Sequence, residues 1–307
     1  MENQGKDRQK LTILVVGAHP ADVFDHCGGT MARHVAAGDR VVCASLTGGL
    51  RIHDTVLSEE FRKRDMTAEE QANLDSIKAA RKSNKEQEVI DACACFGIPE
   101  EDVIFLGFDD SIIVEDPEMI RALAQTIRKV QPQIVINHYP LEGGGIGNQH
   151  ATSAKIVNHA LALAGTTDYE TNTPGWRITR QFFMIASPMT QCYSFLGAMH
   201  MPFVPIYVDI TSVIDKKVKA LNCMVSQQYG GRYALRRTEG NEGTYGHHNR
   251  TGYAEAFVPA APDLYDLLPV SEYHLAWANE QEICTRERGS AWTVPFMYET
   301  RQEAEPI

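Results

Sequence analysis

Strand-like apolar segments alternate with helical segments along most of this 307-residue chain, and no other feature restricts its fold as strongly. The runs "LTILVVGA" (11–18) and "RVVCASLT" (40–47) flank a helical segment at 28–38, which is a strand–helix–strand unit. Further strands are expected at 103–108, 133–138, 181–187 and 205–211, and helices at 74–96, 117–130, 150–165 and 213–229. This order predicts an α/β fold with a mostly parallel sheet and helices on both faces.

The domain organisation follows from the same pattern. We expect residues 1–10 to be disordered and residues 11–258 to form one α/β catalytic domain, elaborated from about Gly230. With 43% hydrophobic residues the chain can bury a large core. Residues 259–307 are expected to form an extension that packs on the domain or on a neighbouring subunit, so we predict a homo-oligomer.

Composition excludes several classes of partner. A net charge of -11 disfavours binding to a phosphate backbone, which needs a basic face. No segment approaches the ~20 apolar residues that span a bilayer, and the polar first ten residues are unlike a secretory signal. Seven scattered cysteines form no disulfide framework. We therefore expect a cytoplasmic protein that acts on a small molecule, without nucleic-acid or membrane partners.

Polar residues capable of binding a metal follow two of the predicted strands. His19 and Asp22 come directly after the first strand, and His150 begins a helix after the glycine-rich loop "LEGGGIGNQH". Because the carboxyl ends of parallel strands meet at one edge of the sheet, these side chains should converge. Two imidazoles, one carboxylate and an open position are typical of catalytic zinc. By spacing alone, a structural role for each residue is more common than metal binding.

The segment "AHPADVFDHCGGT" resembles the signature of the PIG-L/LmbE-like zinc-dependent deacetylase superfamily, A-H-P-D-D-E followed by C-G-G-T. The segments "GNQH" (147–150) and "GYAEAF" (252–257) correspond to two later elements, so the resemblance spans about residues 11–258. It implies a Rossmann-like, LmbE-like fold. It also implies that His19, Asp22 and His150 are the ligands of Zn²⁺, although another divalent metal would fit them.

The chain departs from that signature at its acid–base positions. The acid commonly assigned as general base corresponds to Ala21, and the acid after the second aspartate corresponds to Val23. In the second element Gly147 replaces a histidine and Gln149 replaces an acid. Amide hydrolysis needs a proton acceptor and a proton donor, each worth roughly 10²–10⁴ in rate. A plain sugar N-deacetylase is therefore disfavoured.

The pattern H-x-A-D also resembles the 4-oxalomesaconate hydratase-like branch of this superfamily, and so do "KALNCMVSQQY" (219–229) and "YAEAF" (253–257). Hydration of a conjugated double bond expels no amine, which suits the loss of the deacetylase acids. Those hydratases carry a glutamate in a G-E-R-G-like segment, whereas this chain has Gly48 and Gly49 followed by Leu50 and Arg51. The resemblance therefore implies a hydro-lyase of aromatic-acid catabolism whose base is displaced.

Several residues could replace the missing base. Our predicted catalytic residues are His138, Glu142 and His248; His53, Asp54 and His247 are further candidates. Each can instead be a structural or surface residue. Asp25 and His26 are interpreted as capping the following helix rather than as catalytic.

Arginines near the predicted edge of the sheet indicate that the substrate carries carboxylate groups. We predict that Arg51, Arg232 and Arg250 bind substrate carboxylates, since guanidinium groups bind carboxylates in a bidentate manner. Arg236 and Arg237 belong to the same basic cluster. The sequence thus favours a zinc-dependent hydratase of an unsaturated oxo-carboxylate. A deacetylase or amidohydrolase with a relocated base, or a non-catalytic metabolite-binding relative, remain alternatives.

Overall fold

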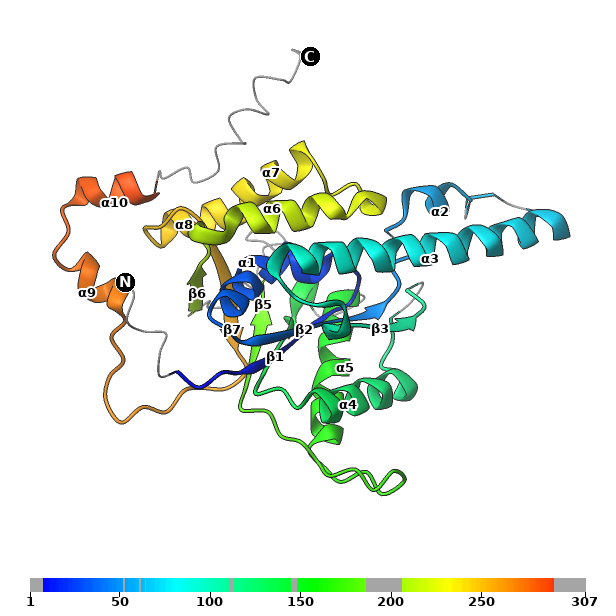
Figure 1. Cartoon of the computed structure of the whole chain (residues 1–307), viewed down its shortest axis with the longest axis horizontal. Coiled ribbons are helices and arrows are strands. Elements are labelled where there is room, and N and C mark those ends of the chain that lie inside the picture. The colour runs from blue at the N-terminus through cyan, green and yellow to red at the C-terminus, as the bar shows by residue number, and fades with distance from the viewer. Residues whose placement is uncertain are drawn as a thin grey trace, which may run out of the picture.

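The computed structural model describes residues 8–185 and 206–289, except residues 52, 61, 64, 111–112 and 145–147. The described residues form a seven-stranded sheet in the order β3–β2–β1–β4–β5–β7–β6 (Figure 1). The strands are β1 (Thr12–Gly17), β2 (Arg40–Thr47), β3 (Val103–Phe108), β4 (Ile134–His138), β5 (Arg180–Met184), β6 (Ile206–Asp209) and β7 (Ala254–Pro259). Neighbours among β1–β5 are parallel, and β7 is antiparallel to β5 and β6.

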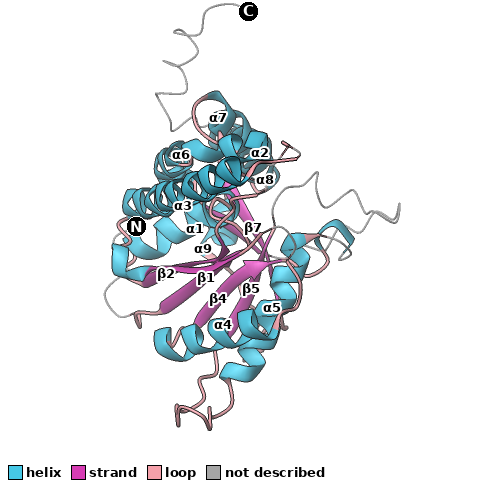
Figure 2. Ribbon diagram, turned by 90° about the vertical axis from the view of Figure 1, so that its right-hand side faces the viewer, coloured by secondary structure: helices cyan, strands magenta, loops and turns pink. Residues whose placement is uncertain are grey.

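Helices cover both faces of this sheet (Figure 2). One face packs against α1 (Asp22–Ala36), α3 (Ala68–Phe96) and α6 (Ile214–Cys223), and the other against α4 (Pro117–Val130) and α5 (Gln149–Ala164). Shorter helices are α2 (Thr55–Glu60), α7 (Arg232–Thr238), α8 (Thr244–His248), α9 (Glu272–Trp277) and α10 (Glu282–Gly289). The predicted α/β fold with a mostly parallel sheet is confirmed.

Strand β1 shows why the sheet is central. Ile13 and Val15 contribute to the core beneath α1, α3 and α6, whereas Leu14 and Val16 contribute to the core beneath α4 and α5. Successive side chains of a strand point to opposite faces, so a strand buried on both sides must be apolar throughout. The continuous run "TILVVG" meets this requirement.

Several elements differ from the sequence-based expectation, among them α3, which begins at Ala68 rather than at residue 74. The helix expected over 213–229 ends at Cys223, and α1 begins at Asp22 rather than at residue 28. Cys27 is non-helical, with φ of -147°, because the Glu255 carboxylate accepts hydrogen bonds from backbone N–H groups just after it. Residues Ala254–Pro259 form strand β7, whereas the sequence indicated this segment only as a family motif and predicted no strand there. The contacts with Glu255 join segments that are distant in the sequence, so no local sequence pattern predicts them.

The predicted extension touches the domain where it is described. Arg180 of β5 pairs with Asp263 at 2.8 Å, and the Tyr273 hydroxyl donates to Asp209 of β6 at 3.1 Å. Residues 1–7 and 290–307 lie outside the described residues, so the domain division and the homo-oligomer stay predictions. No described helix has the length and apolar character needed to cross a bilayer.

Replacing Gly29 with alanine should destabilise the protein by about 1–3 kcal/mol, because a Cβ there would lie 2.7 Å from side-chain carbons of Ile210. Gly240→Ala is the matched control, since no heavy atom lies within 4 Å of its added Cβ. Thermal melting of the two variants measures the difference. Equal melting temperatures would show that α1 can move away from Ile210 without cost.

Candidate metal centre

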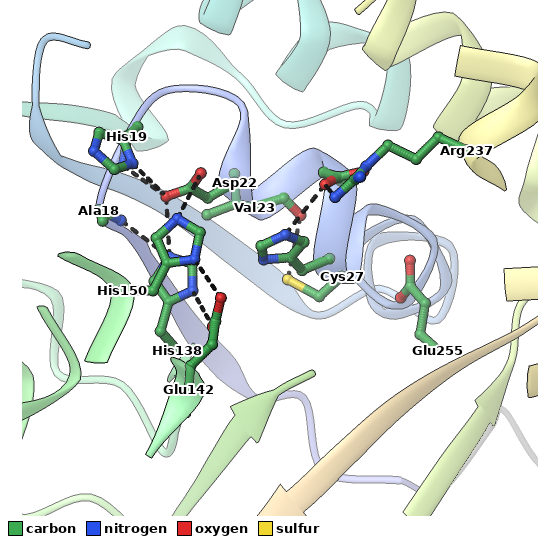
Figure 3. Close-up of polar contacts among 12 residues, drawn as sticks. Ala18, His19, Asp22, Val23, Cys27, His138, Glu142, His150, Arg237 and Glu255 are labelled. Atoms are coloured by element: carbon green, nitrogen blue, oxygen red, sulfur yellow. Dashed lines mark hydrogen bonds and ion pairs between the residues drawn. The ribbon is translucent and has the colours of Figure 1, made fainter. Parts of the chain in front are cut away.

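The three predicted ligands converge at the carboxyl edge of the sheet (Figure 3). His19 follows β1, Asp22 is the first residue of α1, and His150 lies in the first turn of α5 after β4. The turn between the first two closes on itself, because the Asp22 Oδ2 accepts a hydrogen bond from the His19 backbone N–H at 2.7 Å. The H-x-x-D segment therefore supplies two of the three candidate ligands from a single turn.

The spacing of the ligand atoms suits one cation. His19 Nδ1 lies 3.3 Å from Asp22 Oδ2, and His150 Nε2 lies 3.6 Å from Asp22 Oδ1. Two donors bound about 2.0–2.1 Å from one tetrahedral zinc ion are roughly 3.3–3.4 Å apart. His19 Nδ1 is buried and has no hydrogen-bond partner among the described residues. A cation at this point would satisfy that nitrogen, so the residues present fit a metal.

A second layer of side chains fixes the tautomers of both histidines. The Gln149 amide oxygen lies 2.6 Å from His19 Nε2, which assigns the proton to Nε2 and leaves the Nδ1 lone pair for a metal. Glu142 Oε1 lies 2.8 Å from His150 Nδ1 and leaves Nε2 facing Asp22. Gln149, which stands where the superfamily has an acid, thus retains a role in orienting a ligand.

Opposite charges are concentrated in this cluster. Burial would raise the pKa of Asp22, but His150 and His19 hold it well below its usual value. Burial would lower the pKa of His150, but Asp22 and Glu142 raise it well above its usual value. Burial would also raise the pKa of Glu142, which His150 lowers. Both carboxylates are therefore ionised and available to a cation.

His138 lies beside the ligands and is completely buried. Its ring stacks on that of His150 with centroids 4.0 Å apart and an angle of 13° between the planes. Its Nε2 accepts a hydrogen bond from the Ala18 backbone N–H at 3.2 Å and lies 3.0 Å from Asp22 Oδ2. These contacts show that His138 supports the Asp22 carboxylate.

Positions 21, 23 and 49, where the relatives are expected to carry acids, have no room for acid–base chemistry in this chain. Ala21 is 1% exposed and packs in the core with Val23. Gly49 has a φ of +60°, and a Cβ there would lie 2.8 Å from Cδ of Pro20, so no side chain fits. Gly147 lies outside the described residues. A proton carrier must come from another part of the chain.

His53 is the further candidate that touches a ligand. Its ring meets that of His19 edge-on, with centroids 4.5 Å apart, and the residue is partly exposed. Burial lowers the pKa of His53 to about 4. Asp54 caps α2 by accepting hydrogen bonds from the Val56 and Leu57 backbone and pairs with Arg81 at 2.9 Å. Asp54 is thus committed to local structure.

The interpretation of Asp25 and His26 as helix caps is wrong, because both lie inside α1, whose N-cap is Ala21 without a side-chain hydrogen bond, and both are buried next to the candidate ligands. His26 lies one helical turn after Asp22, and its ring contacts those of His138 and His150 at 5.4 and 5.7 Å between centroids. Asp25 lies 3.1 Å from His26 Nε2 and also binds the Arg237 guanidinium through both of its oxygens. The sequence does contain a signal for this position, because His26 is four residues after Asp22 and therefore lies on the same face of a helix. Asp25 and His26 make these contacts with side chains around the site.

Below α1 lies a buried ion network. The Lys217 Nζ donates to the Asp25 carbonyl at 2.7 Å, to Glu242 Oε1 at 2.8 Å and to Glu255 Oε1 at 2.7 Å. Glu255 also accepts hydrogen bonds from the Gly29 and Thr30 N–H groups. The network therefore joins α6 and β7 to the break in α1 and supports the turn that carries Asp22.

Glu242 should make the stability of the wild-type protein depend on pH. Burial raises its pKa to about 7, above the roughly 4.3 of an unfolded glutamate, although Lys217 opposes the shift. Between these values the folded state binds the proton more strongly, so this stabilisation is lost as the pH rises. The free energy of unfolding of wild type relative to Glu242→Gln should fall from pH 5 to pH 7. Parallel curves in urea titrations would contradict this.

The predicted substrate-binding arginines lie at the surface. Arg51, on the loop after β2, pairs with Asp109 at 2.8 Å, while its backbone N–H donates to Asp110. Arg232 and Arg250 are exposed, and Arg250 lies over the Trp277 ring. His248, at the end of α8, is exposed and in ring contact with His247. The described contacts bring neither Arg232, Arg250 nor His248 to the ligands, and their roles stay predictions.

Comparison with known proteins finds a matching family and curated relatives. Residues 14–161 match the PIG-L family, described as GlcNAc-PI de-N-acetylase. The chain is 27% identical to the 4-oxalmesaconate hydratase of Pseudomonas putida over 226 residues, which cover 73% of this chain and 77% of that protein. It is 28% identical to a 1D-myo-inositol 2-acetamido-2-deoxy-alpha-D-glucopyranoside deacetylase of Segniliparus rotundus, with 58% of each chain covered.

Solved structures share the fold. The 4-carboxy-2-hydroxymuconate hydratase of Pseudomonas putida has a TM-score of 0.62 at 24% identity, covering 85% of this chain and all of that one. The N,N'-diacetylchitobiose deacetylase of Pyrococcus horikoshii has a TM-score of 0.60 at 18% identity, covering 84% and 86%. Both likenesses establish the fold alone. The family match and the curated relatives, a hydratase and a deacetylase, show that this chain is an enzyme similar to the PIG-L family.

Proposed function

We propose that the protein is a zinc-dependent hydratase that adds water to an unsaturated oxo-carboxylate such as 4-oxalomesaconate, in aromatic-acid breakdown. The observation that carries this proposal is the contrast between a complete ligand set and the buried methyl group of Ala21. Deacetylation depends on an acid at that position, whereas hydration expels no amine. The 27% identity to a hydratase over most of the chain supports the same choice.

The ligand set defines what a metal would contribute. His19, Asp22 and His150 would hold zinc, which when bound acidifies water or polarises a carbonyl oxygen. Gln149 and Glu142 keep the two imidazoles in the tautomers that binding requires. All five side chains therefore serve to place one cation at the edge of the sheet.

We assign proton transfer to His53. Of the predicted carriers, His138 and Glu142 contact the ligands but are buried, and their contacts suit positioning of Asp22 and His150. His53 is partly exposed next to His19, and its lowered pKa keeps the ring neutral and able to accept a proton. This choice places the displaced base on the loop after β2, near the glycines that replace the hydratase glutamate.

Arg51 lies on the same loop and suits a substrate carboxylate. Its side chain is 41% exposed, and Asp109, its partner at 2.8 Å, is 56% exposed. An exposed pair of this kind is weak, so a carboxylate can replace Asp109 at little cost. Arg237, in the basic cluster, is instead held by Asp25 beside His26.

Replacing His53 with glutamine should lower the hydration rate by about 10²–10⁴-fold, the usual contribution of a general base. Zinc content should be unchanged, because His53 is not a ligand. His159→Gln, at an exposed position of α5, is the matched control. If His53→Gln kept full activity, the proton would have to be carried by another group.

The direct test of the proposed function is the ultraviolet absorbance of 4-oxalomesaconate mixed with zinc-loaded protein. Hydration removes the conjugated double bond, so absorbance should fall with the loaded protein and not with a chelator-treated sample. No difference between the samples would reject this substrate.

An N-deacetylase is the second candidate, because the family match and the relative from Segniliparus rotundus both carry that description. It would use the same ligands with His53 as a relocated base. Release of acetate from N-acetylated sugars, measured under the same zinc-loaded conditions, would favour this candidate over the hydratase.

A further inference from the structure

Two partly exposed thiols meet where α3 packs against α6 (Figure 1). Cys95 lies in the last turn of α3, and Cys223 is the last residue of α6. Their Sγ atoms are 4.0 Å apart, although the two residues are 128 positions apart in the sequence. The contact therefore depends on the packing of the two helices, and no cysteine spacing pattern reveals it.

The distance between the two sulfurs is small enough to be closed by a covalent bond. A disulfide has an S–S length of about 2.05 Å, so the gap has to shrink by roughly 2 Å. Rotation of a side chain about its Cα–Cβ bond can move the sulfur that far without changing the backbone. The chain also leaves the helix at Met224, directly after Cys223. The bond can therefore form without unwinding α3 or α6.

Solvent access separates this pair from the other described cysteines. Cys43 and Cys93 also contact each other, but they are 2% and 0% exposed. Cys27 is buried as well. Cys284 is exposed, but no described thiol lies within hydrogen-bonding distance of its sulfur. Among the described residues, only the pair between α3 and α6 combines thiol contact with access to a dissolved oxidant.

We propose that Cys95 and Cys223 are a site of reversible oxidation, at which a dissolved disulfide such as oxidised glutathione converts the two thiols into one disulfide. The Cys95 thiolate attacks one sulfur of oxidised glutathione, forms a mixed disulfide and releases the other glutathione as a thiolate, which takes a proton from solvent. Cys223 then loses its proton to solvent and attacks the Cys95 sulfur, which releases the second glutathione. Two protein thiols are oxidised and one glutathione disulfide is reduced, so the electrons balance.

The surroundings of the two thiols set the order of these steps. Burial, and after it the charge and hydrogen bond of Cys95, raise the pKa of Cys223 to about 12, so Cys223 keeps its proton while Cys95 reacts. A Cys95 sulfur that carries glutathione has neither a charge nor a thiol proton, which removes that part of the shift. The nearby Asp91 and Glu88 carboxylates act in the same direction and keep the second step slow.

A bond at this place would join two helices that support parts of the candidate metal centre. The Lys85 Nζ on α3 donates to the His53 carbonyl oxygen at 3.0 Å, and the Lys217 Nζ on α6 donates to the Asp25 carbonyl oxygen at 2.7 Å. Oxidation would therefore link the support of the loop after β2 to the support of α1. In reducing surroundings the same two residues are free thiols.

Peptide mapping tests the site without an activity assay, so it can fail while the hydratase proposal stands, and the reverse. Reduced protein, freed of reductant, is incubated with oxidised glutathione at pH 8. Free thiols are then blocked, and the monomer band of a non-reducing gel is digested. In wild type the peptides that contain Cys95 and Cys223 should be recovered joined, and dithiothreitol should separate them. Cys284 should carry glutathione instead, because it is exposed and touches no described thiol.

Matched variants separate a specific bond from scattered oxidation. Cys223→Ser should stop at the mixed disulfide, with glutathione on Cys95, and Cys95→Ser should give no joined peptides. Cys284→Ser should form the bond to the same extent as wild type, and the wild-type map is decisive even if a variant fails to fold. Separate glutathione adducts on Cys95 and Cys223, a bond that fragmentation places at Cys93, or two unreacted thiols when Cys284 has reacted would overturn the proposal.

Discussion

Replacing Lys217 with methionine is expected to lower the free energy of unfolding by about 3–5 kcal/mol. The Lys217 side chain is fully buried and donates to Glu242 and Glu255, which are themselves buried. Methionine has a similar volume, so the loss would come from leaving carboxylates without a counter-ion rather than from a cavity. Urea unfolding at pH 8, where Glu242 is largely ionised, measures the effect.

Lys219→Met is the matched control for this experiment. Lys219 lies on the same helix, but its side chain is 64% exposed and its partner Asp215 is 3.5 Å away. Exposed pairs contribute about 0–1 kcal/mol, so the control should unfold nearly as wild type does. If both variants lost the same small amount, Lys217 would not be holding the break in α1 through Glu255.

Replacing Asp22 with asparagine should abolish activity and lower metal affinity by more than the roughly 10–100-fold that loss of a second-layer partner costs. Asp22 provides an anionic ligand between His19 and His150, and its carboxylate also closes the turn with the His19 backbone. Asparagine keeps the shape and one acceptor oxygen but removes the charge. Zinc affinity from competition with a chelator is the primary measurement.

Asp75→Asn on α3 is a suitable control, because Asp75 is 63% exposed and pairs only weakly with Lys78. Its zinc affinity and activity should equal those of wild type. Retention of tightly bound zinc in Asp22→Asn would mean that the candidate cation site does not depend on this carboxylate. A circular dichroism spectrum like that of wild type would exclude unfolding as the cause of any loss.

The convergence of His19, Asp22 and His150 could be predicted because its constraints are local or follow from topology. The turn from His19 to Asp22 closes within four residues, and a parallel sheet brings the end of β4 and the start of α5 to the edge where β1 ends. The contact of His53 with His19 could not be predicted in the same way. His53 meets His19 only because the loop after β2 folds back over the ligand turn, which depends on Gly49 packing against Pro20.

The sequence by itself determined the α/β fold, through apolar strands such as β1, and the proximity of His19 to Asp22, through a self-closing turn. Only the tertiary structure decided which side chains contact His19, Asp22 and the first turns of α1. Gln149 orients His19 from 130 positions away, and Glu255 supports the break in α1 from 226 positions away. The physical reason is that a buried charge takes whichever partner the packing of helices and strands brings within hydrogen-bonding distance. Periodicity describes which face of an element is buried, but it does not encode that pairing.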